Sequence, residues 1–92
     1  MTEEVATKTR RIKFEIEAEK GSTVYVAGTF NDWDTTKKKL VFKNGSYSGT
    51  LALAPGRYEY KFMIDGIWCV DPKCREWAPN QFGSLNSVLI VE

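Results

Sequence analysis

Residues 57–70, RYEYKFMIDGIWCV, decide the predicted fold, because two strand-like runs meet at Asp65-Gly66. Asp-Gly between such runs is a strong signal for a two-residue type I′ hairpin turn. This register pairs Ile64 with Ile67, Met63 with Trp68, and Phe62 with Cys69. Directly opposed side chains share a face of the sheet. The predicted core face therefore holds Tyr58, Tyr60, Phe62, Ile64, Ile67 and Cys69, and the outer face holds Glu59, Lys61, Met63 and Trp68.

Outward from this hairpin, period-two alternation predicts further strands. In residues 11–19, the apolar positions Ile12, Phe14, Ile16 and Ala18 alternate with charged ones. Residues 23–29 are β-branched and aromatic, residues 31–34 have the composition of a loop, and residues 88–91 form a short apolar run. Residues 71–84 have no period and are expected to form a long loop.

Two other turn signals predict hairpins. Asn44-Gly45 is again typical of type I′ and pairs Phe42 with Tyr47 and Leu40 with Gly49. Pro55-Gly56 has the order of a type II turn. A two-residue loop there places Thr50 and Ala52 on the outer face beside Trp68. With no helical repeat, the chain is predicted to be all-β, an antiparallel immunoglobulin-like β-sandwich of about seven strands.

Length and composition narrow the function. Ninety-two residues allow one domain, here residues 9–92 after a disordered tail at residues 1–8. A net charge of +1 argues against a nucleic-acid partner, and no apolar run is long enough to span a membrane. The start, MTEEVATKTRR, has no apolar signal region, which predicts a cytoplasmic location.

The chain has no His, which excludes serine–histidine and cysteine–histidine catalysis. Cys69 and Cys74 cannot complete a zinc site without carboxylates and are expected to be free thiols. Paired carboxylates are present, but a glycosidase needs two across a cleft, for which a small sandwich has little room. No catalytic residue, metal or cofactor is expected.

Three side chains on or near the outer face are candidates for binding. An indole can stack on the C–H face of a sugar ring, and a Lys ammonium donates to hydroxyl oxygens. Trp68 with Lys61 fits this pattern, and Trp33 in the polar loop 31–34 offers a second platform. The alternatives are that Trp68 packs under a loop or partner, and that Trp33 folds back to plug the end of the sandwich.

Other conspicuous residues favour structural roles. Trp77 is expected to anchor its loop. Lys37–Lys39 is expected to guard an edge strand rather than to form a nucleic-acid or heparin patch. Asn44-Gly45-Ser46 matches a glycosylation sequon but is interpreted as turn chemistry.

Three stretches carry a family likeness: VYVAGTFNDW, PGRYEYKFMIDGIWCVDP and NQFGSLNSVLIV. Together they make residues 23–91 resemble the family 48 carbohydrate-binding module, of the type found as the glycogen-binding domain of the AMP-activated protein kinase beta subunit. The resemblance implies a β-sandwich that binds α-1,4-linked glucans such as glycogen and starch. It implies Trp33 and Trp68 as platforms, Lys61 as a hydroxyl donor and Asn86 as an amide ligand. Ser84 stands where the kinase-type module has Thr, and Phe82 where that module often has Leu.

The resulting hypothesis is a non-catalytic module that holds a partner or fused enzyme on glycogen or starch. The alternative from another class is an immunoglobulin-like protein-interaction module, in which the exposed Trp rings would be interface hot spots.

Overall fold

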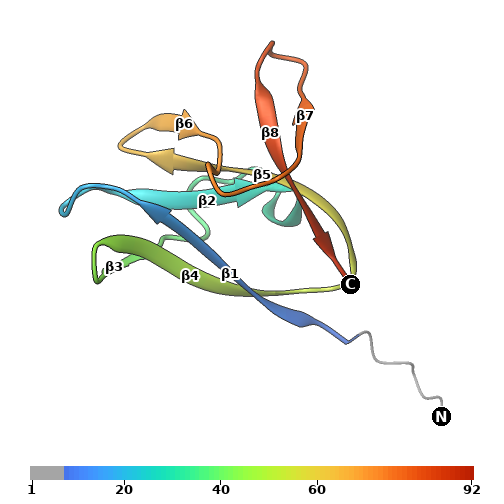
Figure 1. The fold of residues 1–92 in the computed structure, drawn as a ribbon, viewed down its shortest axis with the longest axis horizontal. Helices are drawn as coiled ribbons and strands as arrows, with labels where there is room; N and C mark the ends of the chain where they lie inside the picture. Colours follow the sequence, from blue (N-terminus) through green and yellow to red (C-terminus); the bar gives the residue numbers. More distant parts are fainter. Residues whose placement is uncertain (1–7) are drawn as a thin grey trace.

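The computed structural model describes residues 8–92, which form eight β-strands and one 3-10 turn (Figure 1). The strands are β1 (Arg10–Glu17), β2 (Val24–Gly28), β3 (Val41–Lys43), β4 (Ser46–Leu53), β5 (Gly56–Ile64), β6 (Ile67–Cys69), β7 (Trp77–Pro79) and β8 (Leu85–Val91). The turn, η1, spans Thr29–Asn31. The predicted tail, apart from its last residue, lies outside the described residues. Within residues 8–92 no helix is long and apolar enough to cross a bilayer.

The strands form two antiparallel sheets. The smaller has the order β1-β4-β3, and the larger has the order β2-β5-β8-β7 with β6 also paired to β5. The predicted all-β, immunoglobulin-like sandwich is confirmed, with one strand more than expected among residues 8–92.

Strand β5 is central to the larger sheet because two strands share one of its edges. Gly56 to Tyr60 pair with β8, whereas Phe62 to Ile64 pair with β6. The opposite edge pairs with β2. Lys61 therefore lies at the junction between β8 and β6. The chain leaves β6, runs through residues 70–84, and returns beside this junction as the β7–β8 hairpin, which stands out from the rest of the fold (Figure 1).

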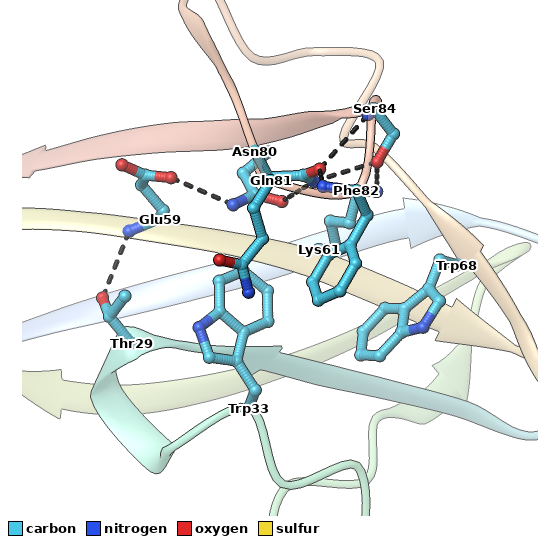
Figure 2. Close-up of a pocket in the computed structure, with 10 residues that line it drawn as sticks. Thr29, Trp33, Glu59, Lys61, Trp68, Asn80, Gln81, Phe82 and Ser84 are labelled. Carbon is cyan, nitrogen blue, oxygen red and sulfur yellow. Dashed lines mark hydrogen bonds between the residues drawn. The ribbon is translucent and has the colours of Figure 1, made fainter.

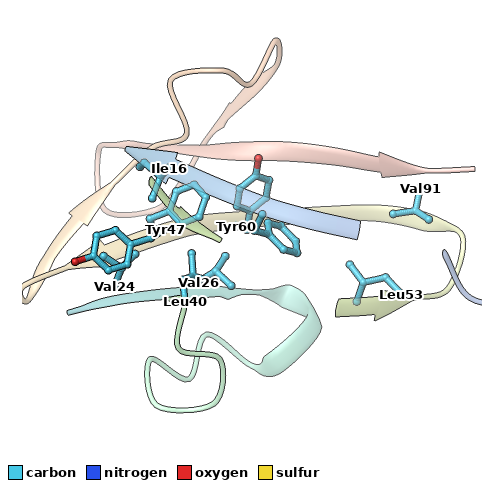
Figure 3. Close-up of a cluster of buried hydrophobic side chains, with 10 residues drawn as sticks. Ile16, Val24, Val26, Leu40, Tyr47, Leu53, Tyr60 and Val91 are labelled. Carbon is cyan, nitrogen blue, oxygen red and sulfur yellow. The ribbon is translucent and has the colours of Figure 1, made fainter. Parts of the chain in front are cut away.

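The core lies between the inner faces of the two sheets (Figure 3). The alternating residues of 11–19 behave as predicted, since Phe14 and Ile16 are buried. The core cluster comprises Phe14, Ile16, Val24, Val26, Leu40, Tyr47, Leu53, Tyr60, Phe62 and Val91. Because strand side chains alternate, this burial sends the intervening residues of β5 to the outer face.

Both Gly-containing type I′ hairpins are confirmed. Asn44 and Gly45 have φ of 53° and 88°, and Asp65 and Gly66 have φ of 50° and 83°. Phe42 pairs with Tyr47, and Met63 pairs with Trp68. The predicted pairing of Leu40 with Gly49 is not a ladder pair, because β3 begins at Val41. Leu40 instead donates its N–H to the carbonyl of Val24 in the other sheet, at 2.8 Å.

The prediction of a hairpin at Pro55-Gly56 is wrong. Strand β4 pairs with β1 and β3, and β5 pairs with β2, β6 and β8, so the turn carries the chain from one sheet to the other. Thr50 and Ala52 consequently lie in the smaller sheet, away from Trp68. Tyr58 Oη donates to the carbonyl of Ala54 at 2.6 Å and ties this corner down. A Pro-Gly turn signal is local, and pairing here is decided by burial of both apolar faces.

Two further expectations are corrected. Ile67, assigned to the core, is 66% exposed, because it lies at a hairpin end that the second sheet does not cover. Residues 71–84, expected to form only a loop, contain β7, which is too short for period-two alternation to show.

Gly28 is required by the close approach of β2 to β5. A Cβ at this position would overlap the carbonyl oxygen of Glu59 and lie 2.8 Å from Tyr60 Cβ. We therefore expect Gly28→Ala to lower the free energy of unfolding by about 1–3 kcal/mol, as overpacking does. The loss should appear as a fall in Tm of about 4–8 °C per kcal/mol. Ser48→Ala, on the outer side of β4, should change stability by less than about 0.5 kcal/mol. Equal Tm values for Gly28→Ala and wild type would contradict this tight packing.

Candidate functional site

A groove of about 700 Å³ lies on the outer face of the larger sheet, and all six residues predicted for the site line it (Figure 2). These are Trp33, Lys61, Trp68, Phe82, Ser84 and Asn86. They come from the η1 loop, β5, β6, the β7–β8 turn and β8. The groove is also lined by Thr29, Glu59, Asn80 and Gln81.

Trp33 is held in place by the turn that follows β2. Its N–H donates to the carbonyl of Gly28 at 2.9 Å, and the N–H of Gly28 donates to Asn31 Oδ1 at 3.0 Å. Asp32 and Trp33 have φ of 56° and 58°, a left-handed conformation that is unfavourable for a bulky aromatic residue. The surrounding bonds hold this conformation and aim the indole into the groove (Figure 2).

Trp68 is positioned by the β5–β6 hairpin, opposite Met63, and remains 43% exposed. The centroids of the Trp33 and Trp68 rings are 6.2 Å apart, and the ring planes are inclined by 76°. The two indoles thus present an edge-to-face pair of apolar surfaces at the groove. Both Trp side chains line the groove, so Trp33 does not lie at the end of the sandwich core.

Among the described residues, Lys61 is the one basic residue that lines the groove and is only 9% exposed. Its Nζ donates to Ser84 Oγ at 2.9 Å. Within residues 8–92 the ion pairs are Lys13–Glu15 and Arg57–Glu59, so the ammonium of Lys61 has no carboxylate partner there. An ammonium has three N–H groups, and two remain for a ligand.

Asn80 organises the turn above Lys61, and the sequence analysis missed it. Its Oδ1 accepts from the backbone N–H groups of Phe82 and Ser84, at 2.9 and 3.2 Å. Backbone N–H groups only donate, so Oδ1 must face them and Nδ2 must face the groove side. Nδ2 donates to Ser84 Oγ at 2.9 Å and to Asn86 Oδ1 at 3.0 Å. Because Asn80 donates to the oxygen atoms of Ser84 and Asn86, the hydroxyl of Ser84 and the amide N–H groups of Asn86 are left to donate elsewhere.

The network ends at a carboxylate. Asn86 Nδ2 donates to Glu59 Oε1 at 3.0 Å, and Arg57 donates to Glu59 Oε2 at 2.8 Å. The hydrogen bond from Asn86 and then that from Arg57 lower the pKa of Glu59 below its ordinary value. Glu59 is therefore ionised at neutral pH. The backbone N–H of Glu59 also donates to Thr29 Oγ1 at 3.2 Å.

Phe82 projects from the β7–β8 turn, and in the view of Figure 2 its ring lies between the two Trp side chains. It is 82% exposed. Phe82 and Trp68 are both exposed and line the same groove, and clustered exposed apolar side chains of this kind mark binding sites. Trp77, at 41% exposure, is not among the residues that line the groove.

Other residues considered in the sequence lie outside the groove. Lys37–Lys39 are not among the residues that line the groove. The backbone carbonyl of Lys38 accepts a hydrogen bond from the N–H of Val26, and the backbone of Lys39 forms an isolated β-bridge with Tyr25. Both cysteines are free and half-buried. Among residues 8–92, no group of three or more His, Cys, Asp or Glu side chains is arranged to hold a metal ion.

Glu59 could have been found from the sequence, because its alternation with Tyr58 and Tyr60 puts it on the Lys61 face. Asn80 and Gln81 lie in an aperiodic segment where no pattern indicates which side chain faces the groove.

Comparison with known proteins identifies relatives of this arrangement. Residues 10–92 match the family described as the glycogen recognition site of AMP-activated protein kinase. Human 5'-AMP-activated protein kinase subunit beta-2 is 33% identical over 75 residues, which cover 82% of this chain and 27% of that protein. The Arabidopsis thaliana protein PTST homolog 2, chloroplastic, is 47% identical over 51 residues, 55% of this chain and 10% of that protein. The chain thus spans about a tenth to a quarter of the length of these two relatives.

The match to a chloroplastic protein contradicts the predicted cytoplasmic location. That prediction relied on the lack of an apolar signal region in residues 1–11, and such a lack does not define a compartment.

A solved structure supports the fold. The maltogenic amylase from S. marinus superposes with a TM-score of 0.74 over 89% of this chain and 13% of that chain, at 22% identity. This similarity concerns the fold alone. The match over residues 10–92, together with the beta-subunit relatives, shows that the chain belongs to the family of carbohydrate-binding modules that includes the glycogen recognition site of AMP-activated protein kinase.

Proposed function

We propose that this chain is a non-catalytic module that binds α-1,4-linked glucans of the glycogen and starch type. In this proposal residues 9–92 form the binding domain. Trp33 and Trp68 are stacking platforms, Lys61, Ser84 and Asn86 are hydrogen-bond donors, and Phe82 is an apolar contact.

The observation that carries the proposal is the steep angle between the two indoles beside a row of donors. Trp33 and Trp68 are inclined by 76°. Successive rings of an α-1,4-glucan are inclined to one another, because the axial anomeric bond bends the chain into a helix. A β-1,4 chain is a flat ribbon and would not place neighbouring rings on two such faces. The geometry therefore favours a curved glucan.

The donors between the platforms suit hydroxyl oxygens. Ser84 Oγ already accepts from Lys61 and Asn80, so its own proton is free to be donated. Asn86 uses its Oδ1 and one N–H within the protein, which leaves its second N–H. A neutral ligand rich in oxygen acceptors is consistent with this set. Family membership supports the same ligand class.

An anchoring role is the further part of the proposal. The human relative is named as a kinase subunit, and both relatives reported above are several times longer than the matched segment. We infer that a module of this kind holds a protein partner or a fused enzyme on the polysaccharide.

The platform role predicts a selective effect of Trp68→Ala. Wild type should bind maltoheptaose with a Kd on the order of 1 mM to 1 μM, and Trp68→Ala should abolish measurable binding in calorimetry. Trp77→Ala is the matched control, because Trp77 has nearly the same exposure as Trp68, 41% against 43%, but does not line the groove. It should bind as wild type. Because Trp68 is half-exposed, its removal should cost well under the roughly 3–5 kcal/mol of a core Trp. A loss of that size, or binding by Trp68→Ala, would count against the platform.

Lys61 is expected to act as a donor and not through long-range charge. A neutral glucan releases no counterions, so wild-type affinity should stay constant between low and high salt. A hydrogen bond from a charged donor contributes about 1.5–3 kcal/mol. Lys61→Gln should bind more weakly than wild type, and Lys61→Ala more weakly still. A steep salt dependence would indicate an anionic ligand instead.

The module is expected to bind without hydrolysis. No reducing ends should be released from maltoheptaose above a buffer control, because the groove holds a single ionised carboxylate, Glu59, among its lining residues and a glycosidase needs two. Trp fluorescence that responds to a candidate protein partner but not to maltoheptaose would favour the protein-interaction alternative.

A further inference from the structure

We propose that the groove continues past Trp33 into a further sugar-binding subsite, where the carboxylate of Glu59 accepts hydrogen bonds from hydroxyl groups of an α-glucan. This rests on the proposed function and extends it by one subsite and one specificity-determining residue.

The position of Glu59 is the first support. Glu59 and Thr29 line the end of the groove away from Trp68, with Trp33 between the two ends (Figure 2). Gln81 extends from the turn above Trp33. A chain that stacks on Trp68 and Trp33 in succession is therefore led toward Glu59.

The second support is that the two ends of the groove differ in hydrogen-bonding polarity. Around Lys61 the protein offers N–H and O–H groups, because Asn80 donates into Ser84 Oγ and Asn86 Oδ1. The oxygen of Asn80 is itself occupied by two backbone N–H groups. A sugar hydroxyl both accepts and donates. A glucan whose oxygens accept from this donor end still has protons that need acceptors, and a carboxylate lies one step further along the groove.

The third support is the free capacity of Glu59. An ionised carboxylate has about four lone-pair positions. Asn86 and Arg57 fill one on each oxygen, so about two remain. Two acceptor positions on one planar group match two neighbouring hydroxyls of a single glucose ring. Because both oxygens and the backbone N–H are already bonded, the carboxylate is held in place before the ligand arrives.

The experiment compares chain lengths by NMR titration, which measures millimolar Kd values. Maltose has only two glucose rings, one for each Trp platform, whereas maltoheptaose can also reach Glu59. We expect Glu59→Gln to weaken maltoheptaose binding by about three- to tenfold, as for loss of a partly exposed charged hydrogen bond. Its effect on maltose should be less than about twofold. Glu15→Gln is the matched control, since Glu15 is also a carboxylate with a lowered pKa, on the other sheet and bonded to Ser46. It should leave both affinities unchanged.

The outcomes separate this inference from the proposed function. Equal losses for both ligands would show that Glu59 acts only by positioning Asn86, and would overturn the subsite. No loss for either ligand would overturn it as well. Failure of wild type to bind either ligand would overturn the proposed function itself, and the subsite with it.

A wild-type pH titration keeps the inference testable should Glu59→Gln fold poorly. The folded-state pKa of Glu59 is lowered by its hydrogen bonds, so the carboxylate stays ionised through neutral and mildly acidic pH. The advantage of maltoheptaose over maltose should be constant there. It should shrink only as pH falls below the ordinary Glu value of about 4.3, where protonation removes the acceptor. An advantage that persists unchanged in acid would overturn the subsite.

Discussion

The packing of Tyr60 and Phe62 in the core holds β5 in a single register, and the whole groove depends on that register. The ring of Tyr60 meets Phe14 of the opposite sheet at 5.1 Å and 73°, and meets Phe62 at 5.9 Å and 87°. Such edge-to-face contacts add to the area that aromatic rings bury. A slip of one residue would turn every side chain of β5 to the other face. The same contacts that build the core therefore send Glu59 and Lys61 into the groove.

The division of one edge of β5 between β6 and β8 explains how residues distant in sequence meet. Segment 70–84 must leave this edge and return to it, and two partly buried hydrogen bonds fix its path. Tyr60 Oη donates to Asp71 Oδ2 at 2.7 Å, and the N–H of Asp71 donates to Ser87 Oγ at 3.0 Å. Burial, and then the bond to Asp71, raise the pKa of Tyr60, so its phenol stays protonated and donating. The loop end is thereby placed where Ser84 can meet Lys61.

The polar side chains of the groove form a chain of hydrogen bonds in which each group fixes the orientation of the next. Two backbone N–H groups orient Asn80, Asn80 orients Ser84 and Asn86, and Asn86 meets the carboxylate of Glu59. A partly satisfied network in a buried site is costly. Among the described residues that are not exposed, no buried side-chain nitrogen or oxygen lacks a partner. The spare donors of Lys61, Ser84 and Asn86 and the spare lone pairs of Glu59 belong to residues that line the groove, where a ligand can reach them.

Much of the fold could be predicted, because alternation and Asp-Gly or Asn-Gly turns act over a few residues. The register of the β5–β6 hairpin, and with it the outward position of Lys61 and Trp68, follows from residues 57–70 alone. The Pro55-Gly56 turn shows the limit of such reasoning. The same local signal serves a hairpin and a corner between sheets, and only the competition to bury two apolar faces distinguishes them. Ile67 shows it again, since alternation assigns a face but cannot say where the covering sheet ends.

By itself, then, the amino-acid sequence determined the all-β class, the faces of β5 and the chemistry available on its outer side. Those properties depend on neighbours two to four residues apart. Tertiary structure alone decided that β7 pairs with β8 and that the Trp33 and Trp68 rings meet at a steep angle. It also decided that Asn80 donates hydrogen bonds to Ser84 and Asn86. Each of these depends on contacts between segments whose separation in space is set by the packing of the whole sandwich, and no local pattern encodes that distance.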